Sequence, residues 1–271
     1  ADWYAVRLDS PWLDVAPLPS RWAPQLLPVF RRRLVGHGPY DRSVSLILRT
    51  LAEWGPAAAP AVPELVGLLD TPVARAAAEA LGAIGPAAAG GRRAAGRLAA
   101  LVTAGPGPGR RPWHGGAQTA AWAYWRVTED PEPALRVCGA AARAGLGQPV
   151  LRYLADLGPQ AAGHADAVRP LLTCPGQWSR VGAAEAWWRI TGDAPPAVEA
   201  LLPELAPLAR HSADPLVLRT VRVLGAIGGP AAAALPVLHE VTSSPRRYGG
   251  IPADEELLRA ARTATSAIEG T

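Results

Sequence analysis

Nearly the same ten residues occur twice in this chain, as LGAIGPAAAG at 81–90 and as LGAIGGPAAA at 224–233. An active-site loop is normally built once, whereas a structural unit that stacks on copies of itself recurs along the sequence. Because a repeat architecture constrains the whole fold, further copies of this motif are the first feature to seek.

Six copies of the unit can be aligned. Each has two apolar residues three positions apart, which we call the first and second register positions. Four copies keep a glycine after the second register position, and two variant copies, YWRVTEDPEPAL and WWRITGDAPPAV, fill the gaps between them. Successive copies are 30, 43, 30, 33 and 37 residues apart, so the two near-identical segments are copies two and six. The register residues are Leu51 and Trp54, Leu81 and Ile84, Tyr124 and Val127, Leu154 and Leu157, Trp187 and Ile190, and Leu224 and Ile227.

Each copy is predicted to form two helices. Apolar residues in 73–84 recur at i, i+4, i+7, i+8 and i+11, which places them on one face of a first helix. Gly85 then ends this helix and Pro86 prevents its continuation. Apolar residues at helical spacing in 62–69 predict a second helix, and Asp130 is expected to cap the second helix of a variant copy. Because alternating strand patterns are nearly absent, the expected fold class is all-α, an α-α superhelix (solenoid) of about six to seven helix-pair repeats.

The ends of the chain and two insertions interrupt this pattern. Residues 21–36 resemble a second helix without its first, and 256–270 a first helix without its second. The chain also lacks Met, so we expect it to be a piece of a longer array. Residues 1–20 have no assignment, while Gly- and Pro-rich insertions are expected at 103–116 and, more briefly, at 243–252.

The repeat unit resembles the HEAT family, especially the short bacterial HEAT-like repeats also found in phycobilisome lyases. The matching features are the Asp-x-x-Val beginning (Asp41 with Val44, Asp214 with Val217), the LGxIGP centre and the AVPELVGLL segment at 61–69. The resemblance covers residues 21–271. It implies a non-catalytic, cytoplasmic scaffold that binds other proteins through a concave surface lined by second helices.

The composition gives little support for other function classes. No run of eighteen apolar residues exists, so no membrane span is expected. Cys138 and Cys174 are isolated, the five histidines are scattered, and phosphate-binding and nucleophile motifs are absent. We therefore expect no metal, no cofactor, no small-molecule substrate and no enzymatic activity. The two isolated thiols suit a reducing compartment.

One cluster of charge suggests where a partner binds. All 27 basic residues are arginines, and no acidic residue occurs between Glu79 and Glu129. Residues 1–150 carry 16 arginines and 11 acids, whereas 151–271 carry 11 arginines and 12 acids. The alternative explanation is a solvated face on an arginine-rich protein. The candidate partner-binding residues are Arg92, Arg93, Arg97, Arg110, Arg111 and Trp113, which we call the basic stripe. A second short run, Arg31, Arg32 and Arg33, would extend this stripe along the same surface.

Two kinds of partner fit this basic stripe. The first is another protein, for example one with an acidic segment; the alternative is nucleic acid, because arginine binds carboxylate and phosphate alike. A HEAT-like DNA repair glycosylase is the enzymatic form of this alternative, with Trp122, Trp125, Asp130 and Trp187 as its candidate set. Packing and helix capping explain these four residues better, since Trp187 falls at a register position and Asp130 precedes a second helix.

Overall fold

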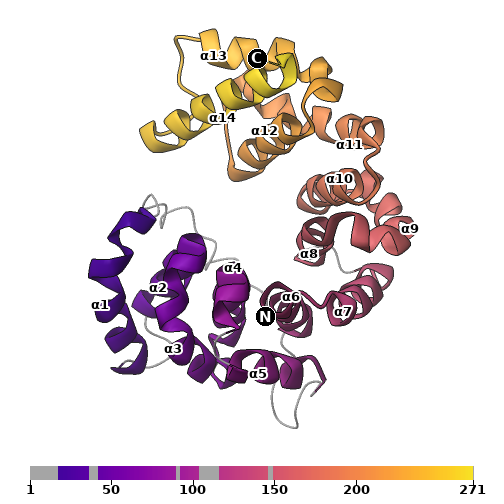
Figure 1. Ribbon diagram of the computed structural model, residues 1–271. Coiled ribbons are helices and arrows are strands. Elements are labelled where there is room, and N and C mark those ends of the chain that lie inside the picture. Colours follow the sequence, from indigo (N-terminus) through magenta and orange to yellow (C-terminus); the bar gives the residue numbers. More distant parts are fainter. Residues whose placement is uncertain (1–17, 37–41, 90–91, 104–115, 146–148, 271) are drawn as a thin grey trace. The chain divides into compact units, whose positions relative to one another are not determined.

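A computed structural model describes residues 18–36, 42–89, 92–103, 116–145 and 149–270 (Figure 1). In these ranges the regular structure is α-helix and 3₁₀ helix, without strands. The chain divides into two compact units, residues 1–133 and 134–271. Among the described residues, no helix combines the length and apolar character needed to cross a bilayer.

Each unit consists of two layers of helices. In unit 1 the first helices stack side by side, α2 on α4 and α4 on α6, and α5 packs against α6. In unit 2, α8 packs on α10 and α12 on α14, with α10 also in contact with α12. The chain is therefore an all-α protein of stacked helix pairs, the solenoid class that the repeats predict. The first helices are α2 (Arg42–Trp54), α4 (Ala74–Ile84), α6 (Gly116–Thr128), α8 (Val150–Leu157), α10 (Gln177–Thr191), α12 (Pro215–Ile227) and α14 (Ile251–Glu269).

The second layer is less regular than the sequence predicts. Proline-rich segments divide several second helices into short 3₁₀ and α pieces, because proline removes backbone donors and prevents continuous α-helical bonding. The apolar residues Val62, Leu65 and Leu69 are nevertheless buried as expected. The α-helices outside the first-helix layer are α1 (Ala23–Gly36), α3 (Val62–Gly67), α5 (Arg92–Thr103), α7 (Glu132–Arg143), α9 (Ala165–Val168), α11 (Ala194–Leu201) and α13 (Leu235–Ser243).

The register residues form the core between the layers, with one exception. Leu81 and Leu154 are completely buried, and Trp187 is only 8% exposed. Tyr124 is half-buried, contrary to the prediction, because Trp122 occupies the core beside it and is 4% exposed. The other register residues are buried as predicted.

First helices end with one of two backbone geometries. In the Gly-Pro copies, Gly85 has φ 66° and ψ −142°, and Gly158 and Gly228 have similar angles, a region that residues with a Cβ avoid. A 3₁₀ turn that contains proline follows each of these glycines. In the variant copies the helix continues for one more residue, and Gly192 ends it in the ordinary left-handed conformation, with φ 75° and ψ −4°. Glu129 takes the equivalent place with φ 65°.

The glycine inside the LGAIG motif allows neighbouring first helices to pack closely. A Cβ atom on Gly82 would lie 2.3 Å from the ring of Trp122 in α6. A Cβ on Gly225 would lie 2.8 Å from the Cα of Ala264 in α14. The LGAIG segment that occurs twice in the sequence is thus a helix-crossing motif.

The end segments and the shorter insertion also differ in detail from the predictions. Residues 21–36 form a short 3₁₀ turn followed by α1. The last helix begins at Ile251, so the final two residues of the predicted 243–252 insertion belong to α14. Within that insertion, Tyr248 is buried, and its backbone N–H donates to Asp254 Oδ1 at 2.8 Å. The insertion at 103–116 lies outside the described residues except for its two ends.

Candidate functional site

The predicted basic stripe is described in part. Arg93 and Arg97 are exposed on α5 and line one shallow pocket of about 410 Å³ together with Asp70, as their four-residue spacing predicts. Arg97 donates to the Asp70 carboxylate. The side chain of Arg92 lies outside the described residues, as do Arg110, Arg111 and Trp113.

Acidic residues that lie before the acid-free stretch in the sequence compensate part of this charge in the folded chain. Asp70 pairs with Arg97, and Glu64 forms an ion pair with Arg31 at 2.9 Å. Arg32 instead donates to a backbone carbonyl of its own helix. The described part of the stripe is therefore less basic than the sequence suggests.

Three residues of the alternative tryptophan and carboxylate set make packing and capping contacts. Trp122 and Trp187 are buried, each in the core of its own unit. Asp130 Oδ1 accepts a hydrogen bond from the backbone N–H of Glu132 at 3.1 Å, at the start of α7. In this structure Asp130 caps a helix, and Trp122 packs against Gly82.

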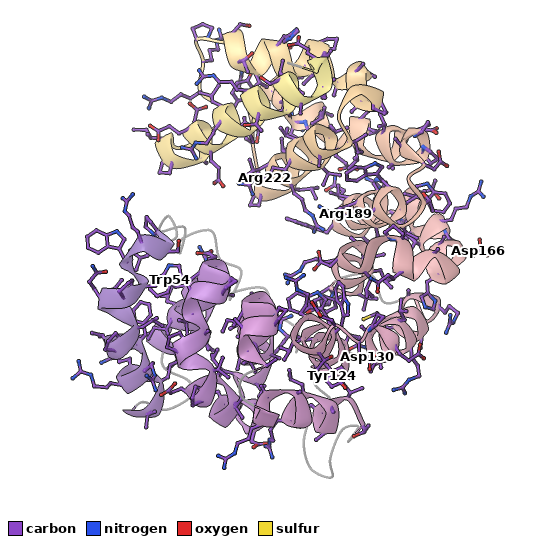
Figure 2. All side chains as sticks on the ribbon, viewed as in Figure 1. Trp54, Tyr124, Asp130, Asp166, Arg189 and Arg222 are labelled. Carbon is purple, nitrogen blue, oxygen red and sulfur yellow. The ribbon has the colours of Figure 1, made fainter. Side chains whose placement is uncertain are left out.

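A different site lies on the first-helix layer of unit 2. Two pockets of about 370 and 390 Å³ cross α8, α10, α12 and α14, and both are lined by Arg222 and Ala226. The two pockets therefore adjoin along α12, and we call them together the arginine groove. Figure 2 shows Arg189 and Arg222 extending from α10 and α12 into the same region. The charged residues of the groove are Arg152, Asp156, Glu185, Arg189, Arg219, Arg222, Glu256 and Arg259.

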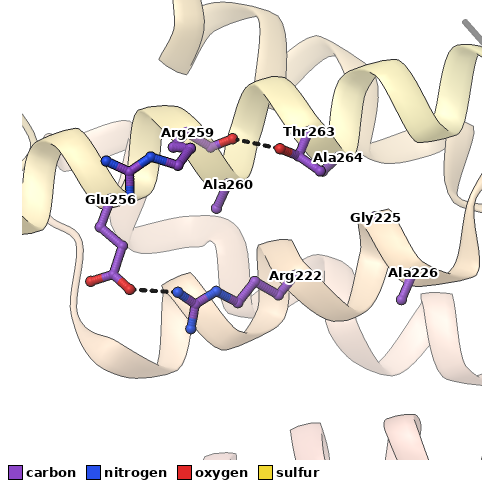
Figure 3. A pocket seen from close by; sticks show the side chains of 8 residues that line it. All are labelled: Arg222, Gly225, Ala226, Glu256, Arg259, Ala260, Thr263 and Ala264. Atoms are coloured by element: carbon purple, nitrogen blue, oxygen red, sulfur yellow. Dashed lines mark hydrogen bonds and ion pairs between the residues drawn. The ribbon is translucent and has the colours of Figure 1, made fainter. Parts of the chain in front are cut away.

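Small residues create the depth of this groove. Between α12 and α14 its lining includes Gly225, Ala226, Ala260 and Ala264 (Figure 3). The close crossing at Gly225 leaves no large side chain on the floor. Between α10 and α12, Trp188 and Val223 supply a larger apolar surface.

The groove carries more positive than negative charge. Its five arginines and three carboxylates give a net charge of +2, although residues 151–271 as a whole carry 11 arginines and 12 acids. Glu185 accepts from Arg219 at 2.9 Å and lies 3.7 Å from Arg189. Arg222 pairs with Glu256 across the gap between α12 and α14 (Figure 3). These ion pairs hold the guanidinium groups on the rim.

Trp188 gives the groove an aromatic wall with a cation above it. Its side chain is half-buried, and the guanidinium carbon of Arg189 lies 5.8 Å from the centre of its ring. Arg126 lies over Trp125 in the same way at 5.7 Å in the other variant copy. An aromatic face beside arginine contacts both apolar and anionic parts of a ligand.

The repeat register contained a sign of this groove that the sequence analysis missed. The residues two before and two after the first register position are charged in several copies, such as Arg152 with Asp156 and Glu185 with Arg189. Residues four apart share one helix face, so aligned copies place these charges in rows across the layer. Counting charge along the chain, instead of across the aligned copies, hides the pattern.

Two titratable groups of unit 2 that lie outside the groove have a shifted pKa. Burial raises the pKa of the Cys138 thiol to about 12, so this cysteine stays protonated and unreactive. Burial and the nearby Arg143 charge lower the pKa of His164, whose Nδ1 lies 3.2 Å from Arg143 Nη1. Among the described residues, no three His, Cys, Asp or Glu side chains are grouped closely enough to hold a metal ion.

Comparisons with known proteins add little about function. No family model and no curated protein matches the chain. Among solved structures, it is similar to an engineered protein at 19% identity and TM-score 0.39, over 93% of this chain and 71% of that one. It is also similar to a designed armadillo repeat protein at 18% identity and TM-score 0.28, over 89% of this chain and 99% of that one. With TM-scores this low, the fold assignment depends on the helix stacking described above.

Proposed function

We propose that this protein is a non-catalytic, HEAT-like repeat scaffold that binds another protein through the arginine groove. The observation that carries the proposal is the groove itself, which crosses four successive first helices and combines ion-paired arginines with an aromatic wall. Helical repeat arrays commonly use extended surfaces of this kind to bind their partners. The cytoplasm is the proposed compartment, because both cysteines are free thiols.

The ion pairs suggest that the carboxylates of the groove position its arginines for ligand binding. Glu185 and Glu256 are both held by arginines of α12. A carboxylate fixed in this way sets the position of its guanidinium partners, which then present their remaining N–H donors to a ligand. The concave surface that the HEAT resemblance implies is lined by second helices such as α5, whereas the arginine groove lies on first helices.

A peptide library displayed on phage tests this proposal directly. The library is selected against the whole chain, and enriched peptides are measured again on Ala226→Gln, which places a neutral side chain at the junction of the two pockets. Ala226 is exposed on α12, so we expect this variant to fold. Ala100→Gln, at an exposed position of α5, is the matched control. We expect enriched peptides to lose at least tenfold in affinity on Ala226→Gln only. Selection that enriches no peptide, or peptides indifferent to Ala226→Gln, would contradict a scaffold function for this groove.

A further inference from the structure

We infer that the occupant of the arginine groove is an extended peptide segment of about ten residues that carries an acidic side chain at roughly every third position. This inference depends on the proposed scaffold function and adds the chemistry of the partner. Three properties of the groove lead to it: the spacing of its helices, its charge and its apolar floor.

The spacing of the helices sets the length and period of the segment. Packed helices lie about 8–10 Å apart, and a chain in the extended polyproline II conformation advances about 3.1 Å per residue and returns its side chains to the same face at every third residue. One helix step therefore corresponds to about three residues, and the span from α8 to α14 to about ten. Each of the four helices supplies at least one arginine to the groove, namely Arg152, Arg189, Arg222 with Arg219, and Arg259. Side chains at every third position would thus pass one arginine-bearing helix after another.

The charge of the groove selects an acidic segment. The net charge of +2 favours a ligand with a small excess of negative charge. The guanidinium group offers forked donors that match the two oxygens of a carboxylate. Each of the groove's carboxylates lies three or four residues from an arginine on its own helix, which favours uncharged ligand residues between the acids.

Nucleic acid suits the groove less well than a peptide does. A DNA duplex carries one negative charge per about 1.7 Å, so a length of about 30 Å brings about 18 phosphates. Five arginines, compensated by three carboxylates, cannot neutralise such a density. A flexible peptide places its few carboxylates beside the arginines and keeps other residues away from Asp156 and Glu256.

The apolar surface accommodates the residues between the acids. Trp188 and Val223 form a wall between α10 and α12, and alanines line the groove between α12 and α14. The alanines leave space above α12 and α14 for the residues between the acids, and the large ring of Trp188 supplies a flat contact for one apolar side chain.

A pair of synthetic peptides tests the inference. Both are labelled with fluorescein and have ten residues; one carries Glu at positions 1, 4, 7 and 10 with Ser and Val between them, and the other carries Gln at those positions. Fluorescence anisotropy on the whole chain at low salt gives the two dissociation constants. We expect the Glu peptide to bind about tenfold more tightly or better, because several partly exposed ion pairs form together. The difference should shrink as salt is raised.

Matched charge variants locate the interaction. Arg189→Gln with Arg222→Gln removes two positive charges from the groove, whereas Arg246→Gln with Arg247→Gln removes two from an exposed segment that does not line it. We expect only the first double variant to abolish the preference for the Glu peptide. Equal loss in both variants would show that net charge alone attracts the peptide, and would overturn the inference.

The remaining outcomes separate this inference from the scaffold proposal. Equal binding of the Glu and Gln peptides, while library peptides still depend on Ala226, would overturn the acidic preference and leave the scaffold function standing. Competition by a ten-base-pair DNA duplex at the concentration that the Glu peptide requires would overturn it in favour of nucleic acid. Failure of both the synthetic peptides and the library would contradict both proposals.

Discussion

Glu129 and Gly192 end equivalent first helices in the two variant copies, yet only one of them is a glycine. Their backbone N–H groups make the same closing hydrogen bond, to Trp125 at 2.7 Å and to Trp188 at 2.8 Å. Both have φ near 70°, a conformation that costs a residue with a Cβ about 1–2 kcal/mol. At the scale of single residues, Glu129 is therefore a point of backbone strain.

Exchanging these residue types should move stability in opposite directions. We expect Glu129→Gly to raise the free energy of unfolding by about 0.5–1 kcal/mol, after allowing for the greater freedom of glycine in the unfolded chain. Gly192→Ala should lower the free energy of unfolding by a similar amount. No neighbouring atom lies near the added Cβ, so the loss comes from the backbone conformation alone. Urea unfolding measures both changes. Stabilisation by Gly192→Ala would contradict the left-handed helix end.

Gly85 should tolerate substitution less well than Gly192. Its ψ of −142° lies in a region that is almost exclusive to glycine. We expect Gly85→Ala to lower the free energy of unfolding by more than Gly192→Ala does, in the same urea experiment. An equal or smaller loss would show that the two helix ends do not differ in backbone geometry.

The lowered pKa of His164 predicts a dependence of stability on pH. Burial and the charge of Arg143 favour neutral His164 in the folded chain. The unfolded chain binds the proton more readily than the folded chain does. The contribution of His164 to the free energy of unfolding is therefore complete above pH 6.5, the ordinary pKa of histidine, and it decreases as the pH falls from there to the lowered pKa. Chemical unfolding between pH 5 and pH 8 measures this slope, which His164→Gln should reduce. An unchanged slope in His164→Gln would assign it to other groups.

At the scale of helices, the glycine inside the LGAIG motif controls how closely two elements approach. We expect Gly82→Ala to lower the free energy of unfolding by about 1–3 kcal/mol, because the added Cβ would overlap the ring of Trp122. Gly96→Ala is the matched control, an exposed glycine in α5 without neighbouring atoms near its Cβ. It should instead stabilise the chain by up to about 1 kcal/mol through helix propensity. Thermal unfolding of both variants compares these effects, and a gain in Gly82→Ala would contradict the close crossing.

The first helices could be predicted from the sequence, and the form of the second helices could not. Leu81 and Gly85 keep the same separation as their counterparts in the other Gly-Pro copies, and burial and helix ends follow from that pattern directly. The second helices contain prolines whose local effect depends on which backbone groups the neighbouring layer satisfies. Tyr124 was misassigned for a related reason, since only the packed structure shows that Trp122 fills the space beside Gly82.

At the scale of the whole molecule, a chain of stacked pairs should respond locally to damage, because each repeat contacts mainly its neighbours. Gly225→Ala forces the added Cβ against the backbone of Ala264. We expect amide hydrogen exchange to accelerate in α12 and α14 and to stay unchanged in α2 and α4. Exchange followed by mass spectrometry checks this, and equal acceleration in all four helices would indicate one cooperative unit.

The candidate site was harder to predict than the fold because it depends on side chains from four repeats. Arg152 and Arg259 are more than a hundred residues apart in sequence but line adjoining pockets. In the described part of the basic stripe, Asp70 from another helix compensates Arg97, whereas Arg110 and Arg111 lie outside the described residues. Function in a repeat protein is therefore better sought in columns of the aligned copies than in runs of the chain.

The crossing at Gly225 makes the proposed recognition surface modular. Because Gly225 has no side chain, α12 packs closely against α14, and the floor of the groove between their charged residues stays open. Each additional pair of this kind would lengthen the surface by one helix spacing, which corresponds to about three ligand residues. Duplication or loss of a repeat would then change the length of the preferred partner in fixed steps, without any new binding chemistry.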